Sequence, residues 1–146
     1  MESETTASDP DPALPAPVAG LACVGVSATP PLLTQLRRQL LAWVGHAGLP
    51  VGRIQDVVLA VYEALANVVE HAYPGETGTL DLHARRNGSR ITVTVTDRGS
   101  WRPAPAPGLL GGRGLPLIHT LADESAFTTT PAGTVVEMSW VCAPGT

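Results

Sequence analysis

Two polar side chains of the types that take part in catalysis and binding lie one helical turn apart in residues 57–73 (VVLAVYEALANVVEHAY). Glu63 and Asn67 are separated by the i,i+4 spacing, so in a helix both project from the same side. A carboxylate and a carboxamide can each accept hydrogen bonds, and a carboxylate can also take up a proton. Alone, however, such a polar stripe is more typical of the solvated face of an amphipathic helix.

Two later segments carry residues of the same kind. Asp97-Arg98-Gly99 follows a strand-like run, and Gly112-Arg113-Gly114-Leu115 stands where a glycine-rich loop enters a short helix. An Asp-x-Gly sequence is usually only a turn, and Gly-x-Gly before a helix is often only a flexible junction. The three segments fall at one end of the predicted fold, and their order along the chain, with about 30 residues between the first two, is a stronger signal than any one of them alone.

Helical periodicity explains how the first segment is positioned. Apolar residues at the i, i+3, i+4, i+7 spacing predict a central helix over residues 51–72, which Tyr73-Pro74-Gly75 ends. An earlier helix begins at Thr29 as its cap, and Gly48 and Pro50 end it. The apolar stripe of the central helix comprises Ile54, Val57, Val58, Val61, Leu65, Val68, Val69 and Ala72.

Strand patterns flank the two helices. The small and Val-rich residues 18–28 predict a buried strand. Residues 79–86 and 90–97 alternate apolar and polar side chains, and Asn87-Gly88 between them is typical of a tight hairpin. The remaining predicted elements are a short helix over residues 114–121 and a final hairpin of residues 127–130 and 134–141.

The resulting order is strand, helix, helix, strand, strand, loop, helix, strand, strand. It predicts an α+β two-layer sandwich in which helices cover one face of a mixed, mostly antiparallel sheet. Residues 1–17 are rich in proline and acidic residues, which predicts a disordered tail. The folded domain is therefore expected over residues 18–146, and 146 residues suit a single domain.

Charge and composition exclude several classes of function. The net charge is −4, but the acids of the tail account for it, so the predicted domain is neutral by formula. A neutral domain argues against a nucleic-acid binder, which needs a basic surface. All nine basic residues are arginines. Without lysine the chain has no P-loop, no lysine of a eukaryotic-type protein kinase and no amine for Schiff-base chemistry.

The cysteines and the N-terminal segment carry no special signal. Cys23 and Cys142 lack the spacing of a metal site, and we interpret them as small core residues. The acidic, proline-rich N-terminus does not resemble a signal peptide, and no apolar run is long enough to cross a membrane. We therefore expect a cytoplasmic protein without a membrane partner.

The three segments resemble the sequence boxes of the GHKL superfamily, the ATP-binding domains of gyrase, histidine kinases and MutL. EALANVVEHAY is similar to the N box, DRGSW to the G1 box and GRGLPLIHTLADE to the G2 segment. GTVVEMSW is similar to the closing strand of the small anti-sigma-factor serine kinases, which the chain resembles most. The resemblance covers residues 20–141 and implies a histidine kinase-like ATPase fold, in agreement with the predicted element order.

The resemblance implies an ATP site with Mg²⁺. Asn67 matches the Mg²⁺ ligand, and Glu63 matches the general base that takes the proton of a substrate serine hydroxyl. Asp97 matches the carboxylate that accepts a hydrogen bond from the adenine amino group. Gly99 is expected to let the backbone approach the base, and Thr134 to support the adenine contact through water. The residues that match the phosphate-binding segment are Gly112, Arg113, Gly114 and Leu115.

Residues 98–112 match the ATP lid of this family, although a proline-rich connector is the alternative interpretation. Trp101 stands where gyrase-type members have a second glycine, and we expect it either at the lid hinge or as a buried anchor. His71 occurs in the N box as well. We interpret it as a hydrogen-bonded residue at the helix end rather than as a catalytic one.

Two hypotheses on function follow from the resemblance. The first is an ATP-dependent serine/threonine kinase of a partner-switching system, which binds a sigma factor and phosphorylates an anti-anti-sigma protein. The second is a non-catalytic switch that binds a nucleotide or a partner without transferring phosphate. Leu109 and Leu110 occupy the region where well-studied kinases have a lid arginine, which favours the switch, unless Arg113 substitutes. The intact pair of Glu63 and Asn67 favours the kinase. Relatives commonly form homodimers, so a homodimer is also an expectation.

Overall fold

The computed structural model describes residues 20–100 and 114–142 of the chain. Within them the order of elements is the one that the sequence predicts. The strands are β1 (Leu21–Ser27), β2 (Thr79–Asn87), β3 (Arg90–Asp97), β4 (Glu124–Thr130) and β5 (Gly133–Val141). The helices are α2 (Pro30–His46), α3 (Val51–Asn67) with the π-helical turn η1 (Val68–Ala72), and α4 (Gly114–Leu121).

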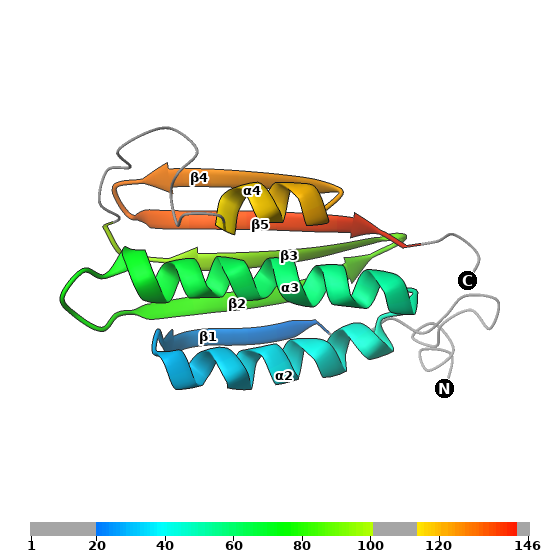
Figure 1. Ribbon diagram of the computed structural model, residues 1–146, viewed down its shortest axis with the longest axis horizontal. Coiled ribbons are helices and arrows are strands. Elements are labelled where there is room, and N and C mark those ends of the chain that lie inside the picture. The colour runs from blue at the N-terminus through cyan, green and yellow to red at the C-terminus, as the bar shows by residue number, and fades with distance from the viewer. Residues whose placement is uncertain (1–19, 101–113, 143–146) are drawn as a thin grey trace, which may run out of the picture.

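The five described strands form one sheet in the order β1-β2-β3-β5-β4. Every neighbouring pair in this sheet is antiparallel. Figure 1 shows α2, α3 and α4 side by side over one face of the sheet, with α3 in the middle. The α+β two-layer sandwich is therefore confirmed.

The core lies between the helices and the sheet. The apolar stripe of α3 supplies Val57, Val61 and Leu65, each 0–1% exposed, as its periodicity predicts. The sheet supplies the alternate residues of its inner face, of which Trp140 and Met138 are fully buried. Because one face of each strand is covered, the register of the sheet is strongly specified.

Local sequence signals account for the ends of several elements. Asn87 pairs with Arg90 across the predicted tight turn, and Gly88 has a φ of 65° there. Gly48 follows α2 with a φ of 91°, as expected of a residue just beyond a helix end. Thr29 is at the N-cap position of α2, although its side chain makes no capping hydrogen bond.

The structure corrects three details of the predicted elements. Residues 18–28 do not form a buried strand, since β1 is an edge strand in which Val24 is 62% exposed. The central helix does not stay α-helical to Ala72, because its last turn widens into η1. Strand β4 begins at Glu124, three residues before the predicted start at residue 127. Edge position, the π turn and strand pairing each depend on contacts with remote segments. The predicted tail lies outside the described residues.

Candidate functional site

Glu63 and Asn67 lie at the C-terminal end of α3, and their surroundings differ. Asn67 is 3% exposed, and its Nδ2 atom has no hydrogen-bond partner among the described residues. Glu63, one turn earlier, is half-buried. A buried amide without a partner costs free energy in the ligand-free fold, so it is unusual in a native structure. This makes Asn67 a candidate for ligand contact.

Asp97 and Thr134 are directly opposite each other where β3 ends and β5 begins. Both are on the helix-covered face of the sheet, with exposed fractions of 2% and 1%. One carboxylate oxygen of Asp97 accepts a hydrogen bond from Gly99 N at 2.9 Å. The Thr134 hydroxyl, like the Asn67 amide, has no partner among the described residues. The cross-strand pairing thus places a buried carboxylate and an unpartnered hydroxyl together.

The π turn brings the end of the helix to the turn after β3. Ser100 N donates a hydrogen bond of 2.9 Å to the carbonyl of Ala72, the last residue of η1. A Cβ atom on Gly99 would lie 2.0 Å from the same carbonyl oxygen. Gly99 is therefore required by the contact between helix and turn, a role that the sequence does not reveal. Figure 1 shows the ends of α3 and β3 and the start of β5 at the same end of the sandwich.

Gly133 makes a second close approach at this end. Its φ is 143°, and a Cβ atom there would lie 1.9 Å from the carbonyl oxygen of Asp97. A side chain would push β5 away from β3 next to the pair of Asp97 and Thr134. Sequence analysis includes Gly133 only as the first residue of the segment GTVVEMSW, since its tight packing depends on the neighbouring strand.

Arg98 points away from the site residues that flank it. Its guanidinium contacts the Asp81 carboxylate, with Nη2 to Oδ2 at 2.6 Å and Nη1 to Oδ1 at 3.3 Å. Asp81 Oδ1 also accepts a hydrogen bond of 2.7 Å from Gly25 N at the bulge of β1. The hydrogen bond from Arg98 is the main cause that lowers the pKa of Asp81. Arg98 therefore anchors the G1-like turn to β2 and β1.

The phosphate-binding segment is described only from its helical part onward. Gly114 and Leu115 are the first residues of α4, which packs against α3. Gly112, Arg113 and Trp101 lie outside the described residues, as does most of the predicted lid over residues 98–112. The structure therefore places the start of α4 beside α3 but does not test the roles predicted for this segment.

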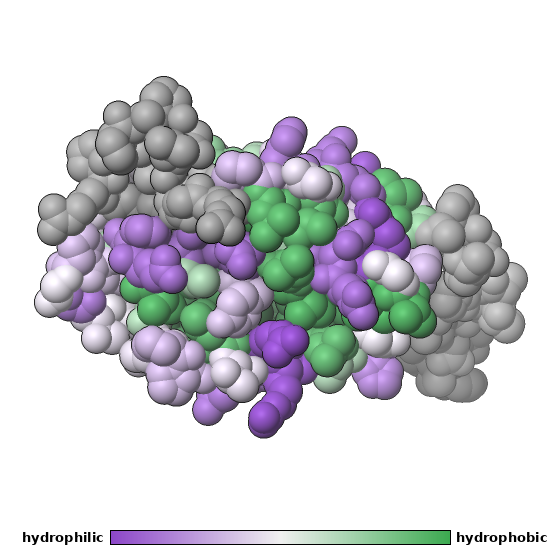
Figure 2. Space-filling model, in the orientation of Figure 1, coloured by the Kyte–Doolittle hydropathy of each residue, from purple (hydrophilic) through white to green (hydrophobic). Residues whose placement is uncertain are grey.

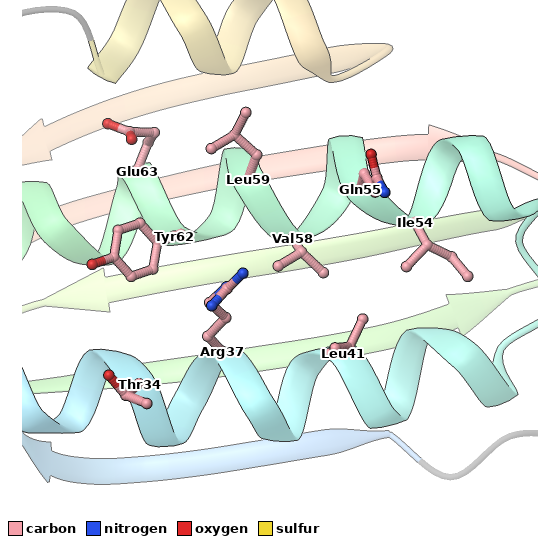
Figure 3. Close-up of a pocket in the computed structure, with 9 residues that line it drawn as sticks. All are labelled: Thr34, Arg37, Leu41, Ile54, Gln55, Val58, Leu59, Tyr62 and Glu63. Carbon is pink, nitrogen blue, oxygen red and sulfur yellow. The ribbon is translucent and has the colours of Figure 1, made fainter.

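A groove of about 690 Å³ runs between α2 and α3, and Glu63 lines one end of it. In Figure 3 Arg37 reaches from α2 toward α3, whereas the Glu63 carboxylate points to the α4 side of α3. Leu41 and Leu59 line the groove and are 48% and 43% exposed. Figure 2 shows apolar surface gathered over the middle of this helical face.

These residues fit an adenine nucleotide with Mg²⁺. Asp97 is an acceptor of hydrogen bonds, which suits the amino group of adenine. The Thr134 hydroxyl beside it can donate or accept a further bond. The oxygen and nitrogen of the Asn67 carboxamide exchange when the group flips, so its unpartnered end can present the hard oxygen that Mg²⁺ prefers. Among the described residues no cluster of three or more His, Cys, Asp or Glu side chains forms an all-protein metal site. Mg²⁺ does not need such a cage, because it retains waters and phosphate oxygens as ligands.

Residues 26–140 match the sequence profile of the family described as Histidine kinase-like ATPase domain. The chain belongs to this family. Membership implies that the nucleotide is ATP and confirms the fold that the N, G1 and G2 resemblances imply. The match spans all described elements of the site, from α3 through β5.

Relatives at modest identity agree with this assignment. The chain is 28% identical over 115 residues to "Anti-sigma F factor" of Thermoanaerobacter sp. (strain X514), covering 70% of this chain and 80% of the relative. It is 38% identical over 86 residues to "Serine-protein kinase RsbW" of Halalkalibacterium halodurans, covering 49% of this chain and 52% of the relative. The chain thus spans about half the length of that kinase.

Solved structures agree on the fold. The RsbU and RsbW domains of Rv1364c from Mycobacterium tuberculosis match with a TM-score of 0.72 and 26% identity, over 87% of this chain and 33% of that chain. The chain spans only a third of that protein. A blue-light activated histidine kinase of Erythrobacter litoralis shares the fold, with a TM-score of 0.57 and 21% identity over 78% of this chain and 48% of that chain.

The remaining sequence predictions concern residues around the site. His71 Nε2 is 3.5 Å from Glu70 Oε1, in keeping with a partnered residue at the helix end. Cys142 is buried and Cys23 is half-exposed, and both are free thiols. None of the described helices is both long and apolar enough to span a membrane.

Proposed function

We propose that this protein binds Mg·ATP and transfers the γ-phosphate to a serine of a protein partner. The observation that carries the proposal is the buried group of Asn67, Asp97 and Thr134, which includes both unpartnered buried polar atoms of the described chain. The proposal gains support from the family and from a relative named as a serine-protein kinase.

The chain's own residues have separate roles in this proposal. Asp97 accepts a hydrogen bond from the adenine amino group, and the Thr134 hydroxyl supports that contact. The Asn67 carboxamide would hold Mg²⁺, which neutralises charge on the phosphate oxygens when bound. Glu63, one turn away, takes the proton of the substrate serine. The serine oxygen then bonds to the γ-phosphorus, the bond from phosphorus to the β,γ-bridging oxygen breaks, and ADP leaves.

The partner is proposed from the relatives and from the groove. The relative named as an anti-sigma factor supports a sigma factor as one partner, and the relative named as a serine-protein kinase supports a protein that bears the target serine. That the serine-bearing protein is an anti-anti-sigma protein is proposed from the resemblance to the anti-sigma-factor kinases. The groove between α2 and α3 offers an apolar surface next to Glu63, on which a protein substrate can dock.

The second candidate function is a switch that binds ATP and a partner without phosphoryl transfer. Leu109 and Leu110 favour it, because they stand where well-studied relatives carry a lid arginine.

The first experiment tests ATP binding by thermal denaturation with and without Mg·ATP. Ligand at about a hundred times its Kd stabilises a protein by roughly 2.7 kcal/mol. For a domain of this size, that is a rise in Tm of very roughly 5 to 10 °C. We expect the rise in the wild type and a smaller one in Asn67→Ala. An unchanged Tm in the wild type would remove the ATP site from the proposal.

The second experiment separates the kinase from the switch. Purified protein is incubated with labelled ATP and an anti-anti-sigma protein, and label on the partner serine is measured. We expect Glu63→Gln to bind ATP as the wild type does but to lose transfer. Glu70→Gln is the matched control, since Glu70 is an exposed carboxylate near the end of the same helix. ATP binding without transfer by the wild type would identify the non-catalytic switch.

A further inference from the structure

Tyr73 is the residue at which the chain leaves η1, and its hydroxyl group joins two segments next to the site. Tyr73 OH donates a hydrogen bond of 2.5 Å to the carbonyl of Thr79, the first residue of β2. It also accepts a hydrogen bond of 2.9 Å from Arg98 N. Sequence analysis treats Tyr73 only as part of a helix stop, because neither contact is with a neighbour in sequence.

The ring of Tyr73 is also fixed in place, because it packs against the backbone of Gly78. A Cβ atom on Gly78 would lie 2.1 Å from the Cε1 atom of the ring, so the ring packs directly on the Gly78 backbone. Gly78 O also accepts a hydrogen bond of 2.9 Å from Ala28 N, which ties this backbone to the start of α2. The position of the hydroxyl is therefore fixed by the packing of the ring as well as by its two hydrogen bonds.

The backbone amide that donates to Tyr73 OH belongs to Arg98. This residue lies between Asp97 and Gly99 in the turn proposed to recognise adenine. Arg98 N comes directly after Asp97, and Gly99 N donates to the Asp97 carboxylate at 2.9 Å. Ser100 N donates to Ala72 O, the residue before Tyr73. Three successive amides after Asp97 are thus bound, two of them by Ala72 and Tyr73 at the helix end. Each bond restricts how far the Asp97 carboxylate can shift.

We propose that Tyr73 is a positioning residue that sets the preference of the nucleotide site for adenine, by holding the turn 97–100 through its hydroxyl. This inference rests on the proposed ATP site. Without the hydroxyl, Arg98 N and Thr79 O lose a partner, and the Asp97 carboxylate moves more freely relative to the base. The expected loss is in recognition of the base, since the two hydrogen bonds of the Tyr73 hydroxyl are with the backbone of Thr79 and of Arg98, next to Asp97.

The test compares binding of ATP and ITP to the wild type and to Tyr73→Phe. ITP carries an oxygen in place of the amino group that Asp97 is proposed to read, so the affinity ratio of ATP to ITP reports on that contact. Losing the hydrogen bond from the adenine amino group to Asp97 would cost about 1 kcal/mol, or roughly fivefold in affinity for ATP. We expect ATP affinity to fall about fivefold in Tyr73→Phe and ITP affinity to stay unchanged, so that the ratio falls. A merely structural effect would weaken both nucleotides alike and would overturn the inference.

Tyr62→Phe is the matched control for nucleotide affinity. Tyr62 is the other tyrosine of the chain, is half-buried on α3 and lines the groove on the side of α2. Its ratio of ATP to ITP affinity is expected to equal that of the wild type. If the ratio of ATP to ITP affinity fell as far in Tyr62→Phe as in Tyr73→Phe, the role proposed for Tyr73 would be wrong. If the wild type binds neither nucleotide, the proposed function fails as well, whereas an unchanged ratio in Tyr73→Phe overturns this inference alone.

Amide hydrogen exchange tests the geometry in the ligand-free protein, and the result for the wild type does not depend on the variant's folding. The Arg98 amide is expected to exchange slowly, because Tyr73 OH binds it, even though residue 98 is exposed. In Tyr73→Phe the same amide is expected to exchange faster. Exchange at the rate of an unprotected amide in the wild type would overturn the inference.

Discussion

The two ends of the sandwich treat their polar groups in opposite ways. At the end where α4 finishes, Trp140 Nε1 donates to Leu121 O at 2.9 Å. There Asp123 accepts from Val141 N at 2.7 Å and pairs with Arg53 at 2.6 Å. At the opposite end, Asn67 Nδ2 and Thr134 Oγ1 have no partner among the described residues. We refer to these as the anchoring end and the nucleotide end.

Under the proposed function, this difference separates residues that stabilise the fold from residues that bind the ligand. Each unpartnered buried polar group destabilises a fold by about 1–3 kcal/mol. Both such atoms of the described chain lie at the nucleotide end, where a ligand with donors and acceptors can satisfy them. Substitutions should therefore lower stability at the anchoring end, and at the nucleotide end should lower binding more than stability.

The largest expected effect is at the anchoring end. Trp140→Ala removes a fully buried ring and the bond to Leu121, and is expected to lower the free energy of unfolding by about 3–5 kcal/mol. Denaturation by urea measures the change. Trp140→Phe, which keeps most of the ring volume, should lose clearly less. Equal losses for both variants would mean that the hydrogen bond, not packing, dominates at this end.

Gly133→Ala should lower both stability and ATP binding, because it changes a backbone contact at the nucleotide end. It would therefore be an exception to the division between the two ends. The φ of Gly133 is 143°, and a Cβ atom added there would lie 1.9 Å from Asp97 O. We therefore expect a loss of about 1–3 kcal/mol in the free energy of unfolding, together with weaker ATP binding. Gly88→Ala is the control, since Gly88 has a φ of 65° and nothing within 4 Å of an added Cβ atom. If chemical denaturation shows equal losses at both glycines, backbone conformation alone explains the effect.

Thr134→Val should sharpen the comparison, since it changes stability and binding in opposite directions. Valine has the shape of threonine but lacks the unpartnered hydroxyl, so the ligand-free protein should be unchanged or more stable by about 1 kcal/mol. Affinity for ATP, measured by calorimetry, should fall. Thr128→Val, on the exposed edge strand β4, should leave ATP affinity unchanged. A marked loss of stability in Thr134→Val would show that its hydroxyl is structurally satisfied.

The smallest effect concerns the pH dependence of the anchoring end. Burial alone would raise the pKa of Asp123, but the hydrogen bonds from Val141 N and Arg53 outweigh it and hold the pKa below its ordinary value. A lowered pKa in the fold means that this stability is present above the unfolded-state pKa and is lost as the pH falls through the folded-state value. Asp123→Asn should therefore flatten the acid limb of a stability curve by a few tenths of a kcal/mol to about 1, given solvent screening. An acid limb as steep as that of the wild type would contradict this.

The sequence predicted the positions of some candidate site residues, but not how they come together. Glu63 and Asn67 follow from helical spacing, and Asp97 follows from a strand that ends in a turn. That Thr134 is directly opposite Asp97 is a matter of strand register, which no local pattern specifies. The sequence did not single out Tyr73 and Gly133, because their close contacts are with Arg98 and Asp97, far away in the chain.

By itself, the sequence determined the types and order of the elements, the apolar face of α3 and the tight turn at Gly88. These depend on periodicity and on backbone preferences that act over a few residues. Only the tertiary structure decided that β1 lies at an edge, that the helix ends in a π turn bonded to Ser100, and that Arg98 turns to Asp81. Those features arise when remote segments pack together and satisfy each other's polar groups, and local sequence does not specify which segments will meet.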